Sequence, residues 1–286
     1  SKSFHTSRFK LKNNKHHNYR LTKHLINNPV INIYDNINQV EWGKLPSKFV
    51  IKSSLGAANQ MVKCLHWNSK RQKYFDDLKN NWITKSQIIN FYAQKKHHSG
   101  AKSVIIIEEY LQSKKQGKIP WDFKMYIAYD QLYMLRVVNR NTTGPNQVAF
   151  FKNKAKNKFN DIKLEKLPFF KWYYNHYTKL VPFKHCQLPS NINQAIKKAI
   201  SVTKFLELPF TRIDAYVLNG KVYLGEITLW GGPFMYDPIR QHHIENIIKL
   251  IDQKKRKIKE YQNRVTWEEK TKLINLTPEE FKKGAL

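Results

Sequence analysis

Two carboxylates in a predicted β-hairpin are the residues of this sequence best placed for chemistry. Asp214 and Glu226 lie within residues 211–228, where two strands rich in β-branched and aromatic residues meet at Asn219-Gly220. Carboxylate oxygens are the ligands that hard cations such as Mg²⁺ prefer, with phosphate oxygens and water completing the shell. The hairpin therefore predicts a magnesium site.

The register of this hairpin decides whether the two acids can share an ion. With a two-residue turn, Leu218 would pair with Lys221. Asp214 and Glu226 would then lie on opposite faces of the sheet, because side chains alternate along a strand.

A three-residue loop changes this outcome. With Gly220 in the left-handed bulge position, Val217 pairs with Lys221. We predict this register, with Glu226 opposite Arg212 and diagonal to Asp214. The residues then placed on one face are Arg212, Asp214, Glu226 and Thr228. The alternative is an exposed hairpin with one Arg/Glu cross-strand pair.

Composition restricts the class of molecule. With 286 residues, 41% of them hydrophobic and 13% aromatic, the chain can bury a sizeable core as one large domain or two lobes. Its 51 Lys and Arg against 21 Asp and Glu give a net charge of +30. Such a positive field attracts nucleic acid, acidic glycans, nucleotides or anionic membrane surfaces, and it does not identify a reaction.

Cysteine use and hydropathy bear on the compartment. Cys64 and Cys186 follow no metal-ligand spacing and indicate no disulfide framework, which favours the cytoplasm or another reducing compartment. No apolar run approaches the roughly 20 residues that span a bilayer. Because the chain begins at Ser1 without Met, a targeting peptide that has been removed is not excluded.

The first part of the chain reads as a basic arm followed by short strands. Residues 1–28 contain few apolar positions and predict an extended arm or weak helix that wraps rather than packs. A loop of small residues at 53–59 separates two of the predicted strands, and residues 71–96 show approximately helical spacing. The strands are predicted at 30–34, 49–52, 60–64 and 103–107.

The second part predicts two hairpins with a helix between them. Residues 123–129 and 132–138 form the first hairpin, and residues 140–190 read as irregular. A helix is predicted at 191–207, and a charged helical segment from 244 to the end. The positions of the 191–207 helix expected in the core are Ala195, Ile196, Ala199, Ile200 and Val202.

Five ordered segments, spanning about residues 30 to 240, resemble the ATP-grasp superfamily, and most closely its TupA-like branch. The segments are 45–52 (LPSKFVIK), Gly56 with 61–63 (MVK), 106–111 (IIEEYL), 122–124 (DFK), and 212–214 (RID) with 225–228 (GEIT). Each is common alone, but five in this order are hard to obtain by chance. Proteins of this branch are encoded with glycosyltransferases for cell-surface polysaccharides and are linked to teichuronopeptide synthesis.

The resemblance implies an α+β ATP-grasp fold in which two α/β lobes with antiparallel sheets sandwich the nucleotide. It implies four regions along the chain. They are a basic arm with a remnant of the region before the fold (1–40), a small lobe that acts as a lid (41–111), a large lobe (112–250) and a charged helical tail (251–286).

The resemblance assigns ATP binding to the small lobe. Lys52 and Lys63 flank the loop of small residues and would neutralise phosphate charge. Free backbone N–H groups at 53–58, including those of Ser54 and Gly56, would cap the phosphates. The alternative for each lysine is a solvated surface amine.

Residues 108–111 would form the hinge that binds adenosine. The backbone of Glu109, Tyr110 and Leu111 would meet the adenine edge. The carboxylate of Glu108 or Glu109 would take the ribose hydroxyls. Alternatively, the two glutamates simply end a strand in solvent.

The large lobe would supply the catalytic cations. Lys124 and Arg136 lie on adjacent predicted strands, where they could stabilise charge on a transferred phosphoryl group. Arg140 is a weaker third candidate, and Arg212 would face substrate or phosphate.

The same resemblance makes Asp214 and Glu226 ligands of a Mg²⁺ ion that bridges the β- and γ-phosphates. Thr228 stands where the broader superfamily usually has Asn, as it does in the TupA-like branch, and its hydroxyl is a weaker ligand. One departure concerns the N-terminal region, which lacks the Asp-Lys followed by Arg of that branch. Lys23 or Arg20 is the candidate substitute.

Three functions follow as hypotheses. The first is an ATP- and Mg²⁺-dependent carboxylate–amine ligase that acts through an acyl phosphate on an acidic small-molecule or glycan acceptor. The second is a basic component of a ribonucleoprotein or other polyanion-bound assembly, with weak or lost catalysis. The third is an ATP-grasp kinase that phosphorylates a polyol.

Overall fold

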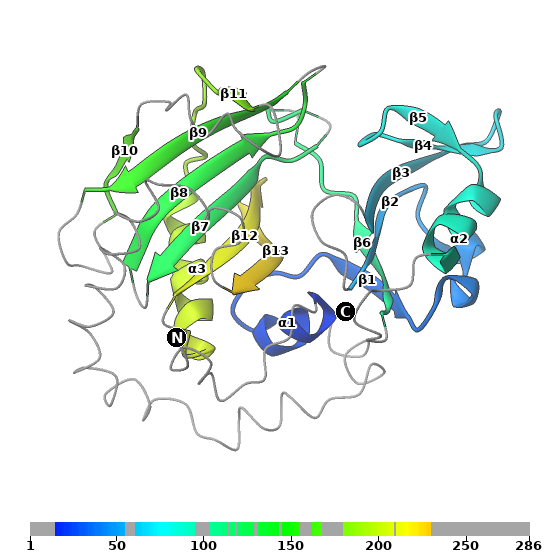
Figure 1. Ribbon diagram of the computed structural model, residues 1–286, viewed down its shortest axis with the longest axis horizontal. Helices are drawn as coiled ribbons and strands as arrows, with labels where there is room; N and C mark the ends of the chain where they lie inside the picture. The colour runs from blue at the N-terminus through cyan, green and yellow to red at the C-terminus, as the bar shows by residue number, and fades with distance from the viewer. Residues whose placement is uncertain are drawn as a thin grey trace.

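Two sheets form the framework of the protein (Figure 1). A six-stranded sheet has the order β1-β6-β2-β3-β4-β5, and a seven-stranded sheet has the order β10-β9-β8-β7-β12-β13 with β11 beside β9. The computed structural model describes residues 15–54, 61–94, 103–113, 115–117, 119–128, 131–142, 145–154, 162–167, 180–208 and 210–229. In this part of the chain, no helix is long and apolar enough to cross a membrane.

The six-stranded sheet packs one face against α2 (Lys85–Gln94) and the short helices η2 (Ile37–Gln39) and η3 (Trp42–Lys44). Phe49, Ile51 and Leu65 point to this face and are fully buried. The strands are β1 (Val30–Tyr34), β2 (Lys48–Ser53), β3 (Val62–Asn68), β4 (Lys73–Asp76), β5 (Asn81–Ile83) and β6 (Ile105–Glu109).

The predicted strands of this lobe are present within a few residues of their expected places, but the helix predicted at 71–96 was wrong over most of its length. Residues 73–83 form β4 and β5, and only 85–94 are helical. Gln72 and Asn80 adopt positive φ angles of 50° and 52°, which close two tight turns. The burial of β4 alternates with period two, as a strand requires.

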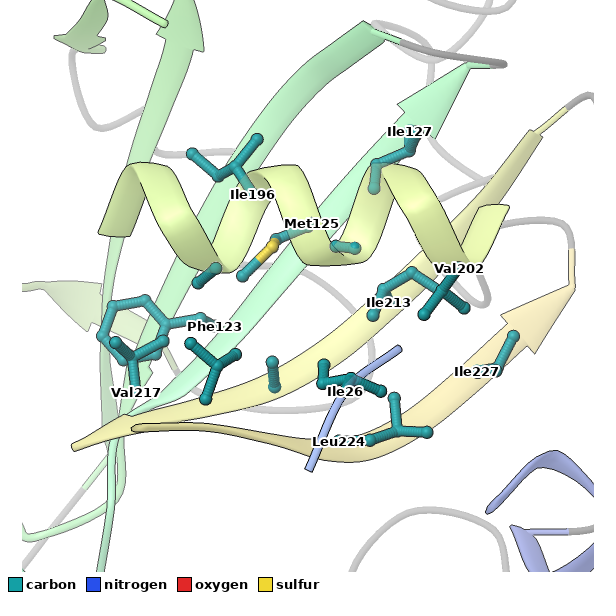
Figure 2. Packing of buried hydrophobic residues seen from close by; sticks show 14 of the residues in the cluster. Ile26, Phe123, Met125, Ile127, Ile196, Val202, Ile213, Val217, Leu224 and Ile227 are labelled. Atoms are coloured by element: carbon teal, nitrogen blue, oxygen red, sulfur yellow. The ribbon is translucent and has the colours of Figure 1, made fainter. Parts of the chain in front are cut away.

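The seven-stranded sheet is covered on one face by α3 (Ile192–Phe205) (Figure 2). Ile196 and Val202 of the helix pack against the layer of strand residues that includes Met125 and Ile213. The strands are β7 (Asp122–Ala128), β8 (Gln131–Asn139), β9 (Asn146–Asn153), β10 (Leu164–Lys166), β11 (Leu180–Pro182), β12 (Phe210–Leu218) and β13 (Lys221–Leu229).

The predicted hairpin β7/β8 and the helix α3 with its core positions are confirmed. The prediction that residues 140–190 are irregular was wrong where β9, β10 and β11 form. Phe150 and Phe151 of β9 are buried on opposite faces of the sheet, so that the aromatic content of this stretch serves packing on both sides.

An N-terminal helix, α1 (Lys15–Thr22), docks beside β13 (Figure 1). Tyr19 and Leu21 are fully buried, so the expectation that this region wraps rather than packs was wrong for α1. After the helix, Asn27 forms a parallel bridge with Tyr223, and its carbonyl accepts from the Leu224 N–H at 2.8 Å. Residues 1–14 of the predicted arm and the predicted C-terminal helix lie outside the described residues.

The turn of the β12/β13 hairpin has two residues. Leu218 pairs with Lys221, while Asn219 and Gly220 adopt φ angles of 51° and 73°. Positive φ at both central positions is the signature of a type I′ turn, which matches the twist of the flanking strands. The three-residue loop predicted from the sequence was therefore wrong.

A bulge at Gly225 nevertheless places the two acids on one face. Ala215 pairs with Leu224 and Asp214 with Glu226, which leaves Gly225 as the extra residue of β13. One extra residue shifts the alternation by one position, so that Asp214 and Glu226 face the same side. A side chain at Gly225 would put Cβ 3.2 Å from the Asp214 carbonyl oxygen, which favours glycine in the bulge.

Gly220→Ala tests the turn. Nothing lies within 4 Å of the position of an added Cβ, so the expected loss of about 1–2 kcal/mol in the free energy of unfolding comes from the left-handed backbone alone. Gly43→Ala is the matched control, because Gly43 has the same open space without a positive φ. Urea denaturation measures both. Equal stability of the two variants would contradict the assigned turn.

Candidate active site

One row of side chains crosses five strands of the seven-stranded sheet, which we call the large sheet, on the face away from α3. Glu226 lies opposite Asp214, and Asp214 lies opposite Lys124. The row continues from Lys124 to Arg136 and from Arg136 to Phe150. Directly opposed side chains are about 5 Å apart at Cβ, so neighbours in this row act on one another.

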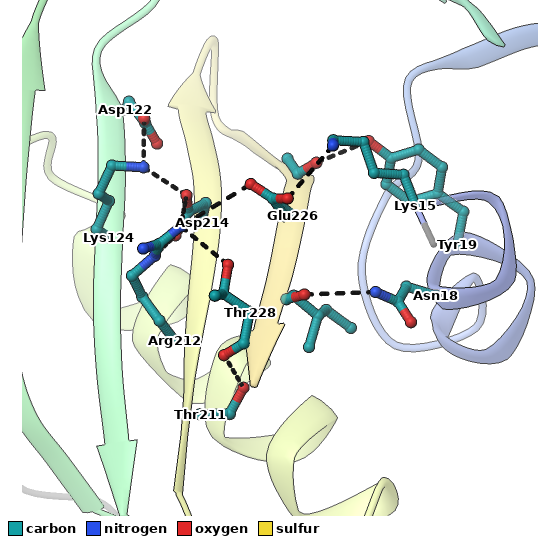
Figure 3. A network of polar contacts seen from close by, with 12 residues as sticks. Lys15, Asn18, Tyr19, Asp122, Lys124, Thr211, Arg212, Asp214, Glu226 and Thr228 are labelled. Carbon is teal, nitrogen blue, oxygen red and sulfur yellow. Dashed lines mark hydrogen bonds and ion pairs between the residues drawn. The ribbon is translucent and has the colours of Figure 1, made fainter. Parts of the chain in front are cut away.

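Lys124 joins two acids at the centre of the site (Figure 3). Its Nζ lies 2.8 Å from Asp122 Oδ2 and forms a very short contact with Asp214 Oδ2. Arg140 Nη2 contacts the same Asp122 oxygen at 3.0 Å. Burial raises the pKa of Asp122, but the charges of Lys124 and Arg140 outweigh this effect and hold the pKa below its ordinary value. The Asp122 carboxyl is therefore ionised at neutral pH.

Arg212 forms an ion pair with Asp214 through two of its nitrogens. Its Nε lies 2.5 Å from Asp214 Oδ1 and its Nη2 lies 2.9 Å from Asp214 Oδ2. Nη2 also donates to Thr228 Oγ1 at 2.9 Å. Burial lowers the pKa of Arg212, but the carboxylate raises it well above its ordinary range. The residue opposite Arg212 is Thr228, so the expectation that Glu226 lies there was wrong.

Glu226 is the more accessible of the two predicted metal ligands. Its side chain is 34% exposed, against 7% for Asp214. Lys15 Nζ lies 3.3 Å from Glu226 Oε1, and Arg212 Nη2 lies 3.8 Å from Oε2. Sequence reasoning missed Lys15, and the phosphate-contacting role suggested for Lys23 or Arg20 stays a prediction. The available signal was the i,i+4 spacing of Lys15 and Tyr19, which puts both on the side of α1 that faces β13.

The donor set suits a hard cation in part. Asp214 and Glu226 are opposed on neighbouring strands, with the Thr228 hydroxyl beside them. Both oxygens of Asp214 already accept hydrogen bonds from Lys124 and Arg212. No group of three or more His, Cys, Asp or Glu among the described residues could hold a metal by itself. An ion here needs phosphate oxygens to complete its shell, and Mg²⁺ binding stays a prediction.

Lys52 is buried in an ion pair with Glu108. Its Nζ lies 2.6 Å from Glu108 Oε1, and the two side chains are 6% and 5% exposed. Burial lowers the pKa of Lys52, although the Glu108 carboxylate opposes this shift. Of the two candidate glutamates, Glu108 points inward and Glu109 is exposed.

Tyr19 connects this ion pair to the β12/β13 hairpin. Its hydroxyl lies 2.6 Å from Lys52 Nζ and donates to the Gly225 carbonyl at 2.8 Å. The helix α1 thus links a residue of the small sheet to the bulge that sets the direction of Glu226.

Lys63 does not share a face with Lys52. It pairs with Ile51, on the side of the sheet that packs on α2, and its Nζ contacts Asp76 at 3.2 Å and the Phe91 ring at 4.5 Å. The structure therefore does not bring the two predicted phosphate lysines together. Adjacent strand positions point to opposite faces, which explains the separation.

Two predicted backbone donors are already occupied. The Ser54 N–H donates to Val104 O at 2.9 Å, so the expectation of a free N–H at Ser54 was wrong. The Glu109 N–H donates to Pro29 O at 2.7 Å and is likewise not free for adenine. Gly56 lies outside the described residues.

The rest of the predicted hinge follows Glu109 directly. The Tyr110 hydroxyl donates to Asp77 Oδ2 at 2.5 Å, and Leu111 is buried. Burial, together with the Asp77 carboxylate, raises the pKa of Tyr110 far above its ordinary value. The roles predicted for residues 108–111 in adenosine binding stay predictions.

Acid is expected to weaken the fold through His16. Burial lowers the pKa of His16 to about 4 from 6.5, so the unfolded chain binds the proton more readily. The contribution of neutral His16 is complete above pH 6.5 and is lost as the pH falls to about 4. The expected loss is on the order of 1–2 kcal/mol, because water screens part of the burial cost.

Urea denaturation across this pH window measures the effect, with His16→Gln as the comparison because carboxylates also titrate there. The parent should lose more stability than the variant. Parallel pH profiles would show that His16 does not contribute.

The two sheets and the row of acids and cations define a protein of the ATP-grasp class. The sequence model of the family described as TupA-like ATPgrasp matches residues 5–242, and the chain belongs to this family. The predicted family and fold class are confirmed. None of the curated proteins matches the chain.

Solved structures similar to this one include two ligases and a macrocyclase. D-alanine–D-alanine ligase from Bacillus anthracis is 13% identical, with a TM-score of 0.47 over 85% of this chain and 69% of that chain. The enzyme from Helicobacter pylori is 15% identical, with a TM-score of 0.43 over 84% and 58%. Macrocyclase MdnC bound with precursor peptide MdnA from Microcystis aeruginosa MRC is 15% identical, with a TM-score of 0.42 over 85% and 63%.

Proposed function

We propose that the protein is an ATP- and Mg²⁺-dependent carboxylate–amine ligase that acts through an acyl phosphate on an acidic acceptor, which includes anionic polysaccharide or its precursors. The observation that carries the proposal is the row on the large sheet, which has two opposed carboxylates at one end and two cations next to them. Membership of the TupA-like ATPgrasp family supports the general class of an ATP-dependent ligase.

Each residue of the row would have its own role in the proposed reaction. Glu226 and Asp214 would hold Mg²⁺, which when bound neutralises charge on the β- and γ-phosphates. Lys124 keeps Asp214 in place from the neighbouring strand. Arg136 forms no ion pair with a described carboxylate, and its guanidinium lies 5.9 Å from the Phe150 ring. It therefore has donors left for the transferred phosphoryl group or for an acidic acceptor.

The proposed reaction has two steps. An acceptor carboxylate oxygen attacks the γ-phosphorus of ATP, and ADP leaves. An amine nitrogen then attacks the acyl carbon and loses a proton, while inorganic phosphate leaves and an amide remains. Both steps place negative charge beside Lys124 and Arg136, where fixed cations stabilise it.

Calorimetry with Mg-ATP tests the nucleotide site. Glu226→Gln keeps the size of the side chain and removes its charge, so we expect the dissociation constant to rise about tenfold or more with Mg²⁺ and to change little without it. Glu165→Gln is the control, because Glu165 is a partly exposed carboxylate on β10 that pairs with Lys152 and Lys154, outside the row. Failure of the parent to bind Mg-ATP would overturn the proposal.

Two rival functions remain open to direct tests. The net charge of +30 and the fully engaged Asp214 carboxylate favour a polyanion-bound assembly, such as a ribonucleoprotein, with weak or lost catalysis. No binding of Mg-ATP by the parent would support that function. An ATP-grasp kinase would form ADP and a phosphorylated acceptor without an amide, so product analysis separates it from the ligase.

A further inference from the structure

A second row of side chains crosses the small sheet, away from the acids of the large lobe. Lys48 lies opposite His66, His66 opposite Phe75, and Phe75 opposite Trp82. The row lies on the face that also carries Lys52, opposite the face covered by α2, because these positions alternate with the buried Phe49, Leu65 and Tyr74.

The rings of this row lie in contact from one strand to the next. His66 and Phe75 lie nearly parallel, with centroids 5.3 Å apart and an interplanar angle of 25°. Phe75 and Trp82 meet edge to face at 5.0 Å. The Arg71 guanidinium lies 4.7 Å above the Trp82 ring. All three rings are partly exposed, and the His66 side chain is 31% exposed.

The exposed charges along this row are positive. Lys48, Arg71 and Lys73 are exposed. The only acids in residues 48–84 are Asp76 and Asp77, and both are engaged inside the lobe. Asp76 accepts from Lys63 at 3.2 Å, and Asp77 accepts from the Tyr110 hydroxyl at 2.5 Å and also lies 3.2 Å from His66 Nδ1.

We propose that this surface is a binding site for single-stranded nucleic acid. Its residues, which we call the basic aromatic face, are Lys48, His66, Arg71, Lys73, Phe75 and Trp82. Single strands bind where cations that track phosphates stand beside aromatic rings, because unpaired bases stack on the rings with little dependence on sequence. Arg71 over Trp82 adds a guanidinium plane on which a base can stack.

This proposal goes beyond the proposed ligase function. The strands of a sheet are about 4.8 Å apart, so the row from Lys48 to Trp82 extends about 14 Å and spans a few nucleotides. The acids near the row are already paired, Asp77 with the Tyr110 hydroxyl and His66 and Glu108 with Lys52, so the exposed Lys48, Arg71 and Lys73 complement the charge of a phosphate backbone.

Fluorescence anisotropy with the full chain and a labelled oligothymidylate of about 12 nucleotides tests the proposal, since single-strand sites occupy roughly 4–16 nucleotides. We expect Trp82→Ala to raise the dissociation constant about five- to hundredfold, because it removes one stacked base. A combined Arg71→Gln and Lys73→Gln variant should reduce the slope of log Kd against log salt by about 1.4, the value for two phosphate contacts on a single strand.

Lys85→Gln is the matched control. Lys85 is also an exposed cation near a tryptophan, with Nζ 5.7 Å from the Trp42 ring, but it lies on the α2 side of the same lobe. The affinity of the Lys85→Gln variant for the oligonucleotide should equal that of the parent. Circular dichroism checks that each variant folds. If Trp82→Ala fails to fold, the oligonucleotide affinity of Arg71→Gln tests the proposal instead, because Arg71 is exposed.

Two results with the oligonucleotide would overturn the proposal: no binding by the parent, or an unchanged affinity in Trp82→Ala. Tighter binding of a duplex than of the single strand would also overturn it. So would tighter binding of a heparin fragment, which would identify a surface for acidic glycans. Mg-ATP binding should be unchanged in Arg71→Gln. The oligonucleotide and ATP measurements therefore test this site and the proposed ligase separately.

Discussion

Replacing Lys124 with methionine is expected to reduce ATP-dependent turnover by about two to three orders of magnitude, the usual cost of removing one fixed group that stabilises the transition state. Lys124 occupies the centre of the row, between Asp214 and Arg136. The Lys124 amine also contacts Asp122. Without this amine, Asp122 keeps only the countercharge of Arg140, and Asp214 keeps that of Arg212. Methionine matches the unbranched apolar stem of lysine and lacks only the terminal amine, which limits the effect mainly to charge and hydrogen bonding.

Turnover is measured as product formed per folded molecule, with folding checked by a urea titration. Lys124→Arg keeps the positive charge and should restore part of the rate. Lys152→Met is the control, because Lys152 lies on the same face of the sheet with its side chain 52% exposed. Full activity of Lys124→Met would exclude a catalytic or positioning role for this amine.

The second large effect concerns stability. Glu108→Gln is expected to lower the free energy of unfolding by about 3–5 kcal/mol, because it leaves the Lys52 ammonium buried without a countercharge. The two groups are 2.6 Å apart and almost inaccessible to water. Burial already lowers the pKa of Lys52, so the loss of its partner would move that pKa further down.

Glu109→Gln is the matched control, since it makes the same change one residue away on an exposed side chain and should change stability by less than about 0.5 kcal/mol. A double variant, Lys52→Met with Glu108→Leu, removes both charges and should recover most of the loss. Urea denaturation measures all three. Equal losses in Glu108→Gln and Glu109→Gln would contradict the burial of the ion pair.

The β12/β13 hairpin shows how much of a structure local sequence can predict. The same-face placement of Asp214 and Glu226 was predicted correctly, but through the wrong register. A three-residue loop and a two-residue turn followed by a bulge both shift the alternation by one residue. The sequence Asn219-Gly220 suits either turn, and Gly225 is a local hint of a bulge. The choice depends on pairing along the whole length of β12 and β13.

Pairing between distant segments explains the other errors. Residues 71–96 contain hydrophobic positions that fit a helix, but tight turns at Gln72 and Asn80 fold 73–83 into the sheet beside β3. The basic N-terminal region looked unable to pack. It nevertheless forms α1, because Tyr19 finds a partner in Gly225, 206 positions away.

The sequence by itself determined the charge of the protein, its main strands and the core face of α3, because net charge is additive and because period two and period 3.6 are local properties. It also determined the family, through short motifs that keep their order. Only the tertiary structure decided that Glu108 rather than Glu109 pairs with Lys52, that Lys63 faces α2, and that Lys15 reaches Glu226. These contacts depend on distances between segments that lie far apart along the chain, which no local pattern of residues encodes.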